Sequence, residues 1–201
     1  MLLREMSHRV KNLFTLAGAV VALSRRSAGS VEQLAEAIQS RLGALARAHE
    51  LTLPDVKRQK AATPASLQAL LRTIVSPYED QAGQTVSVSG ADIAVEGHAV
   101  TSLALVFHEL ATNAAKYGAL SVAGGRIDAV LSVAAGQLHL DWLERGGPPI
   151  IAPPDTVGFG TWLVDGTIQG QLHGSVERRW HPEGLGIRIA IPLSQLSAGS
   201  S

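Results

Sequence analysis

Val106–Ser121 reads VFHELATNAAKYGALS, and the fold prediction depends on this stretch. At about 100° per residue, a helix places Glu109, Asn113 and Lys116 on one face and apolar residues such as Leu110 on the opposite face. We expect the apolar face to pack and the polar face to present its charged and amide groups. A carboxylate and an amide one turn apart suit Mg²⁺, which keeps several waters and shares phosphate oxygens. The alternative is an amphipathic surface helix without a ligand, and the other segments must decide.

The composition excludes several classes of protein. The 201 residues carry 17 Lys and Arg against 17 Asp and Glu, so there is no electrostatic footprint for nucleic acid. There are no cysteines, which excludes disulfides, thiolate metal sites and cysteine nucleophiles. The longest apolar stretch, Ala17–Leu23, is far shorter than the roughly 18 residues that indicate a membrane-spanning helix. We therefore expect no membrane segment and a cytoplasmic protein.

Two helices are expected at the start of the chain. From Leu3 to Val20, apolar residues recur at alternating spacings of three and four, which is typical of a coiled coil or helical bundle. Ser30 can cap a second helix, with Gln33 at the capping-box position. A similar apolar stripe follows at Val31, Leu34, Ile38, Leu42, Leu45 and His49. Because a lone hairpin buries little, we expect two copies of the chain to form a four-helix bundle.

The rest of the chain predicts helices on one face of a mixed sheet, so the overall class is α+β with an α/β sandwich. Pro54 and Asp55–Lys60 indicate a linker, after which Thr63-Pro64 should cap and begin a helix. A strand is expected at Thr85–Ser89 and a helix at Thr161–Leu172. Two hairpins are expected, one from Arg126–Val133 and Leu138–Glu144, the other from Gly174–His181 and Leu185–Pro192.

Two further features favour phosphate chemistry. Gly158 and Gly160 lead into a predicted helix, where free backbone N–H groups and the positive end of the helix dipole bind phosphate. Such a pair alone more often marks a turn, but here it follows a polar helix face and a strand that ends in Glu144. His8 lies at an exposed heptad position of the first helix, with Asn12 one turn further on. An exposed histidine can be phosphorylated, although a lone one is usually an ordinary surface residue.

Three segments, taken together and in order, resemble the HWE class of bacterial sensor histidine kinases. They are EMSHRVKN at Glu5–Asn12, HELATNAAKYGAL at His108–Leu120 and WLERGGP at Trp142–Pro148. The resemblance implies a dimerisation and phosphotransfer hairpin at 1–55, a linker at 56–60 and a Bergerat-type ATP-binding domain at 61–194; we expect a flexible tail at 195–201. It also implies ATP and Mg²⁺ as cofactors, a homodimer, and a response-regulator aspartate as the recipient of the phosphoryl group. The signal would come from an upstream sensor domain in a longer kinase or from a separate sensor.

The resemblance assigns roles to His8 and to four residues of the central helix. His8 matches the phosphoacceptor, whose neutral imidazole is nucleophilic near pH 7. Asn113 matches the Mg²⁺ ligand and Glu109 the acidic residue of the same box, which is also a candidate base. Lys116 matches a lysine near the phosphates, and Tyr117 a ring beside the nucleotide.

The remaining assignments concern the adenine base of the nucleotide, the lid and dephosphorylation. Glu144 matches the residue that accepts a hydrogen bond from the exocyclic amine of adenine, and Gly147 belongs to the turn that follows it. Gly158 and Gly160 match the glycines of the lid and helix start, and Asn12 could position water for dephosphorylation. His108 and Trp142 define the class without an assigned role, and packing under the adenine site is the simplest one for Trp142.

Three alternatives stay open. The chain could be a phosphotransfer relay that has lost ATP binding, an ATPase or serine kinase on the same Bergerat sheet, or a purely structural dimer module. The family commonly has an arginine where this chain has Trp162, and if that arginine holds phosphates or the lid, its absence weakens ATP binding.

Overall fold

The structure is a computed structural model that describes residues 18, 20–22, 24–25, 29–52, 64–79, 85–154 and 158–197. His8 and Asn12, most of the first expected helix and the expected linker lie outside these residues.

Helix α2, Val31–Glu50, begins where the sequence predicts. The hydroxyl oxygen of Ser30 accepts the N–H of Gln33 at 3.2 Å, and the Gln33 side chain accepts the N–H of Gly29 at 3.0 Å. These reciprocal bonds satisfy N–H groups that have no partner inside the helix.

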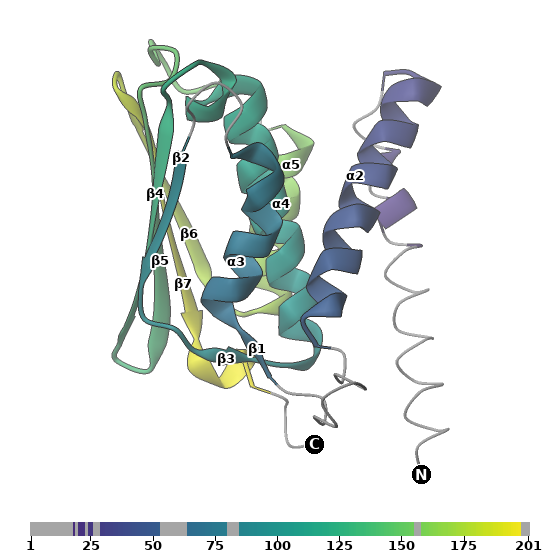
Figure 1. Cartoon of the computed structure of the whole chain (residues 1–201), viewed down its shortest axis with the longest axis vertical. Helices are drawn as coiled ribbons and strands as arrows, with labels where there is room; N and C mark the ends of the chain where they lie inside the picture. Colours follow the sequence, from purple (N-terminus) through teal and green to yellow (C-terminus); the bar gives the residue numbers. More distant parts are fainter. Residues whose placement is uncertain are drawn as a thin grey trace.

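The packing face of α2 differs from the predicted apolar stripe. Its buried residues are Arg41, Ala44, Leu45 and Ala48, whereas Leu42 is exposed. The reason is that α2 lies against α4 of the same chain, and the small side chains of the two alanines let the helices approach closely (Figure 1).

Five strands form one mixed sheet in the order β2-β4-β5-β7-β6. Their bounds are Thr85–Gly90 (β2), Arg126–Ala134 (β4), Gln137–Arg145 (β5), Ser175–His181 (β6) and Gly184–Pro192 (β7). β2 pairs with β4 in parallel, and the other pairs are antiparallel. The predicted strand and both predicted hairpins are confirmed.

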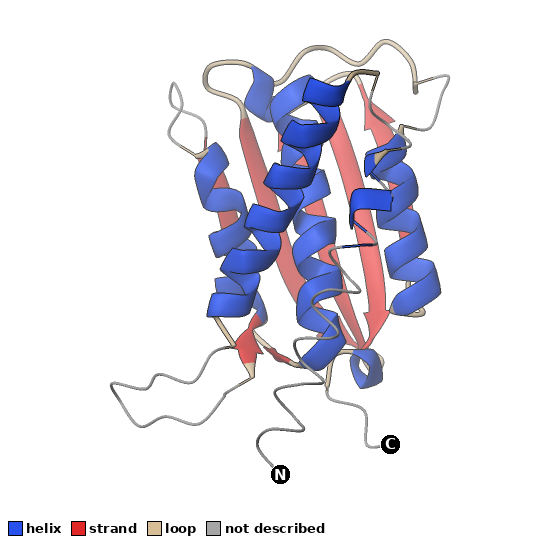
Figure 2. Cartoon of the chain, turned by 90° about the vertical axis from the view of Figure 1, so that its right-hand side faces the viewer, coloured by secondary structure: helices blue, strands red, loops and turns tan. Residues whose placement is uncertain are grey.

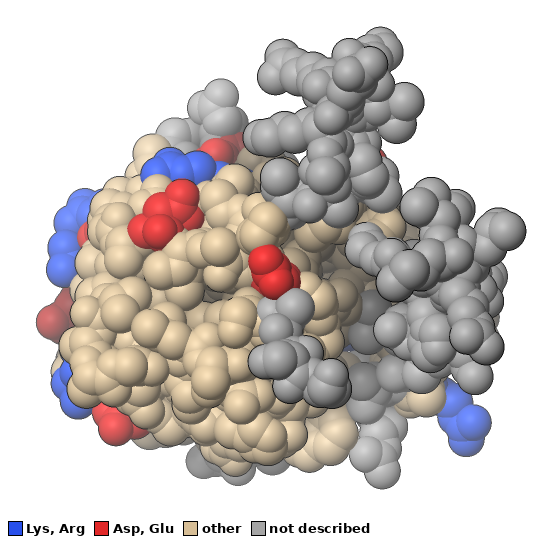
Figure 3. All heavy atoms as spheres, turned by 90° about the horizontal axis from the view of Figure 1, so that it is seen from below, with Lys and Arg blue, Asp and Glu red and all other residues tan. Residues whose placement is uncertain are grey.

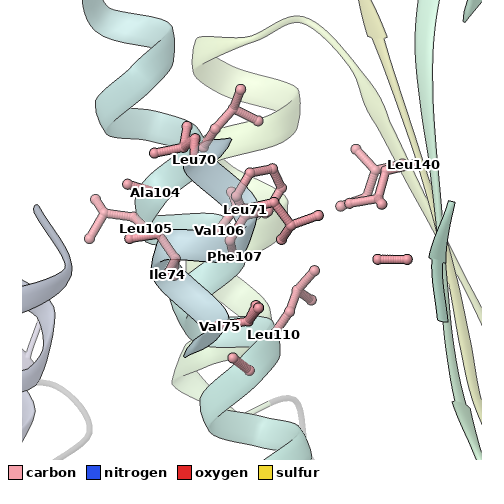
Figure 4. Close-up of a cluster of buried hydrophobic side chains, with 14 of the residues drawn as sticks. Leu70, Leu71, Ile74, Val75, Ala104, Leu105, Val106, Phe107, Leu110 and Leu140 are labelled. Atoms are coloured by element: carbon pink, nitrogen blue, oxygen red, sulfur yellow. The ribbon is translucent and has the colours of Figure 1, made fainter. Parts of the chain in front are cut away.

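Helices cover one face of this sheet (Figures 1 and 2): α3 at Leu67–Val75, α4 at Gly97–Tyr117 and α5 at Phe159–Asp165. α5 continues into a turn of π-helix, η3, at Gly166–Gln171. Side chains of α3 and α4 form much of the core, and Leu140 of β5 faces them from the sheet (Figure 4). With α2 outside α4, the described residues form three layers, and the predicted α/β sandwich is confirmed.

The start of α3 is a correction to the sequence prediction. The cap is Ser66, whose hydroxyl oxygen accepts the N–H of Ala69 at 3.0 Å, and Pro64 precedes the helix. Ala65–Ser66 form a short strand, β1, because they pair with Ala94–Val95, β3, which delays the helix.

The end of the packed chain also extends past the predicted boundary at 194. After the short helix η4, Leu193–Gln195, Leu196 is buried and its carbonyl oxygen accepts the N–H of Glu96 at 2.9 Å. No helix within the described ranges combines the length and apolar character that crossing a membrane requires. On the face seen from below, the acidic and basic side chains of the described residues lie scattered over a largely uncharged surface (Figure 3).

Candidate functional site

A cavity of about 640 Å³ lies where the end of α4, the end of β5, the following loop and the start of α5 meet. It brings together residues that are far apart in the sequence and that the sequence assigned to one site. Those that line it are Asn113, Tyr117, Glu144, Gly147, Gly158 and Gly160. Lys116 is exposed in the last turn of α4 and is not among the lining residues.

The polar face of α4 is less exposed than the sequence predicts. Glu109 has only 4% of its surface exposed, Asn113 is half-buried and Lys116 is exposed. The expectation that all three face outwards is therefore wrong for Glu109. The cause is α2, which covers the side of α4 that an isolated sandwich would leave open.

Arg41 of α2 is the partner of Glu109. Its Nε donates to Glu109 Oε1 at 2.8 Å and its Nη2 to Oε2 at 3.1 Å, while Nη1 donates to Ser24 at 2.9 Å. The guanidinium carbon also lies 5.1 Å from the ring centroid of Phe159, at the start of α5. Both carboxylate oxygens of Glu109 thus already accept a hydrogen bond from Arg41, and the two side chains form one buried ion pair.

His108, the neighbour of Glu109, contacts two other elements. Its Nε2 lies 3.1 Å from the hydroxyl oxygen of Ser40 in α2, and its Nδ1 lies 3.2 Å from that of Tyr78 in η1, Ser76–Tyr78. Burial, together with the positive charges of Arg41, Arg47 and Lys116, lowers the pKa of His108 to about 4. A neutral imidazole therefore links α2 to the sandwich, which is a structural role for a residue that defines the class.

Glu144 lies on the helix-facing side of β5. Alternate residues of the strand are buried, so Glu144 follows Trp142 on the same face and is itself only 6% exposed. Its Oε2 accepts the N–H of Ala119 at 2.9 Å, and its Oε1 accepts the indole N–H of Trp142 at 3.2 Å. Burial raises the pKa of Glu144, and these two hydrogen bonds act in the opposite direction.

Glycines let the backbone close around these carboxylates. A Cβ at Gly118 would collide with the Glu144 carboxylate, and a Cβ at Gly147 would lie 2.9 Å from backbone atoms of Ala119. A Cβ at Gly160 would lie 2.7 Å from Glu109 Oε2 and 3.3 Å from the Asn113 amide nitrogen. A side chain at position 160 would therefore have to displace the Glu109 carboxylate, which Arg41 holds in place.

The residues present fit a magnesium ion carried by a nucleotide. Among the described residues there is no group of three or more His, Cys, Asp or Glu that could hold a metal. Asn113 places an amide group at the cavity wall. Such a site suits Mg²⁺, which takes one or two protein oxygens and completes its shell with phosphate oxygens and water.

Sequence reasoning missed Arg41 and Gly118. Arg41 lies on the helix face that carries Ala44 and Ala48, and a long cation among small residues is a detectable signal for a buried partner. Gly118 follows directly on the last helical residue, Tyr117, where glycine usually indicates only a helix end. Gly118 also leaves room for the Glu144 carboxylate. The sequence does not show this role, because it depends on which strand lies beside the end of α4.

The fold is that of a histidine kinase catalytic core. A solved blue-light activated histidine kinase from Erythrobacter litoralis matches it with a TM-score of 0.70 at 23% identity, over 96% of this chain and 59% of that chain.

Sequence comparisons agree with this structural match. Residues 5–92 match the HWE histidine kinase family model. Blue-light-activated histidine kinase 1 of Erythrobacter litoralis is 37% identical over 193 residues, which cover 95% of this chain and 52% of the relative. The blue-light-activated histidine kinase of Rhizobium johnstonii is 38% identical over 195 residues, covering 95% and 53%. The chain therefore carries a match to the HWE histidine kinase family model and is similar along most of its length to two blue-light-activated histidine kinases, of whose length it spans about half.

Proposed function

We propose that the chain is the catalytic core of an ATP-dependent protein-histidine autokinase, which phosphorylates His8 and passes the phosphoryl group to a response-regulator aspartate. The observation that supports this most is the cavity of about 640 Å³ that gathers the residues assigned to the nucleotide from the end of α4, the end of β5 and the start of α5. Residues 1–55 would be the phosphotransfer hairpin, joined by a linker at 56–60 to the ATP-binding domain at 61–194.

Each part of the nucleotide would meet a different wall of the cavity. Glu144 would accept a hydrogen bond from the exocyclic amine of adenine, with the ring of Tyr117 beside the nucleotide. Asn113 would supply an oxygen ligand to Mg²⁺, which offsets the negative charge of the phosphates. Backbone N–H groups near Gly158 and Gly160 would contact the phosphates, and Lys116 would approach them from the last turn of α4.

The transfer itself demands positioning more than covalent chemistry from the protein. A nitrogen of the neutral His8 imidazole attacks the γ-phosphorus, the P–N bond forms as the bond to the β-phosphate oxygen breaks, and ADP leaves with that electron pair. The proton on the ring is then lost to a base. Glu109 is the candidate base, with Arg41 bound to both of its oxygens, and Asn12 would position water for dephosphorylation.

The partners follow from this chemistry. We expect a homodimer, a response regulator as the acceptor, and a sensor that is either an upstream domain or a separate protein. The cytoplasm is the compartment that supplies ATP, and we expect no nucleic-acid partner and no membrane segment in this chain.

Autophosphorylation with γ-labelled ATP and Mg²⁺ tests the proposal. Wild type should acquire label that is acid-labile and base-stable, as phosphohistidine is, and His8→Ala should acquire none. Asn113→Ala should remove nucleotide binding and label together. Thr101→Ala, a change in the first half of α4 at a half-buried position that does not line the cavity, serves as the control and should keep both.

The same experiment separates the alternatives. Label that survives His8→Ala would refute the histidine assignment and favour an ATPase or serine kinase. Absence of nucleotide binding in wild type would leave the phosphotransfer relay.

A further inference from the structure

We propose that Trp142 is a positioning residue for purine specificity: its indole N–H fixes Glu144 as a hydrogen-bond acceptor, so that the cavity selects a 6-aminopurine nucleotide over a 6-oxopurine. The inference rests on the proposed function, and it gives a role to a residue that defines the class but that the assigned chemistry does not use.

Trp142 acts through Glu144 because it has no access to the cavity itself. Its side chain is fully buried, and it is not among the residues that line the cavity, whereas Glu144 and Ala119 are. The two-residue spacing along β5 puts both side chains on the same face of the sheet. The indole therefore reaches the carboxylate from the core side, away from the space that a nucleotide would fill.

Two N–H donors favour the Glu144 carboxylate as a hydrogen-bond acceptor. Oε1 accepts from the Trp142 indole at 3.2 Å and Oε2 from the Ala119 amide at 2.9 Å. An indole N–H and a backbone N–H can only donate, and the oxygens of an ionised carboxylate accept such bonds more strongly than those of a protonated carboxyl, so the two donors favour the ionised form. An ionised carboxylate has about four acceptor sites, which leaves free lone pairs for a ligand.

The free lone pairs distinguish the two kinds of purine. The 6-amino group of adenine donates and pairs with the carboxylate, whereas the 6-oxo group of hypoxanthine only accepts and would leave two acceptors facing each other. A buried site built for a donor rejects a ligand without it, because the site's polar group is then unpaired.

Burial works against this arrangement. It raises the pKa of Glu144, and the N–H groups of Ala119 and Trp142 limit the rise. Without the indole N–H, the carboxyl should take up a proton at a higher pH, and a protonated carboxyl can donate to a 6-oxo group. Among the described residues, the other titratable side chains that line the cavity are Tyr117 and Arg178, and Arg178 is paired with Asp165 at 2.8 Å.

Trp142→Phe tests the inference, because it keeps an aromatic ring in the core and removes the N–H. Binding of ADP and of inosine diphosphate to the whole chain is measured calorimetrically between pH 5.5 and pH 8, in wild type and variant. We expect the preference for ADP to fall about 10-fold in the variant, which corresponds to the loss of one hydrogen bond to a charged group. ADP binding by the variant should also weaken at a higher pH than it does in wild type.

The control and the contrary outcomes are distinct. Trp162→Phe removes the same N–H from a half-exposed position outside the cavity wall and should leave the ratio unchanged. An unchanged ratio and pH profile in Trp142→Phe, or an equal loss for both nucleotides, would overturn the inference. If wild type binds neither nucleotide, the proposed function fails instead. Should Trp142→Phe not fold, benzothienylalanine at position 142 replaces the N–H by sulfur at nearly the same volume, with the same expected results.

Discussion

Arg41→Met should destabilise the contact between α2 and the sandwich. The substitution keeps a long apolar side chain but leaves the Glu109 carboxylate without the two donors that lie 2.8 and 3.1 Å from its oxygens. Both side chains of the pair are buried, with 9% and 5% exposed. The variant also loses the contact of the guanidinium with the Phe159 ring.

The size of the effect follows from the burial of the remaining charge. Removing one partner of a buried ion pair costs about 3–5 kcal/mol, because the other charge stays desolvated. For a chain of this size, that corresponds to a fall in the melting temperature of roughly 10 °C. The loss of global stability cannot exceed the free energy of separating α2 from α4. Once the two helices separate, the Glu109 carboxylate is in water again and its desolvation no longer costs free energy.

Two measurements together detect global unfolding and local separation of α2. Urea unfolding followed by circular dichroism reports the global loss, and hydrogen exchange of the α2 amides reports local separation of the helix. The matched control is Arg188→Met, which removes an arginine from the exposed pair with Asp141, where little change is expected because water screens the charges.

The double variant Arg41→Met/Glu109→Gln sharpens the test. It removes the buried charge as well as its partner and should recover most of the stability lost in the single variant. The reasoning fails if Arg41→Met leaves both the unfolding midpoint and α2 exchange unchanged, or if the double variant is less stable than the single one.

Three further perturbations have defined outcomes. Burial lowers the pKa of His108 to about 4 from 6.5, so on acidification the unfolded chain binds a proton at this histidine before the folded chain does. The free energy of unfolding should therefore fall by about 2 kcal/mol between pH 7 and pH 5. Denaturation of wild type and of His108→Gln at both pH values should show a smaller fall in the variant. Ser30→Ala removes the cap of α2 and should cost about 1 kcal/mol at most by urea unfolding, with a larger loss contradicting a purely local role. Gly118→Ala should displace the Glu144 carboxylate and weaken ADP binding at least 10-fold by calorimetry, whereas unaltered binding would show that the cavity tolerates the shift.

Local signals in the sequence were sufficient for most of the sandwich. The predicted hairpin of β4 and β5 agrees with a sheet that has one covered face, because alternate side chains such as Ile127, Ala129 and Leu131 are buried. The cap at Ser30 was equally local, since its partner Gln33 lies three residues away. The start of α3 was wrong because the pairing of β1 with β3 joins residues 65–66 to 94–95, a long-range contact that no capping rule contains.

The sequence by itself determined which residues we assign to the proposed nucleotide site, since their types and their order along the chain carry the resemblance behind that assignment. Only the tertiary structure decided how they are used. The sequence pattern puts Glu109 on an open polar face, but α2 covers that face and supplies Arg41 from 68 positions away. Likewise, the pattern puts Trp142 and Glu144 on one side of β5, but it does not reveal that the Ala119 amide meets the same carboxylate. Helical and strand periodicity depend on neighbours along the chain, whereas burial, ion pairing and pKa depend on which elements meet in space, and that is decided when the core forms.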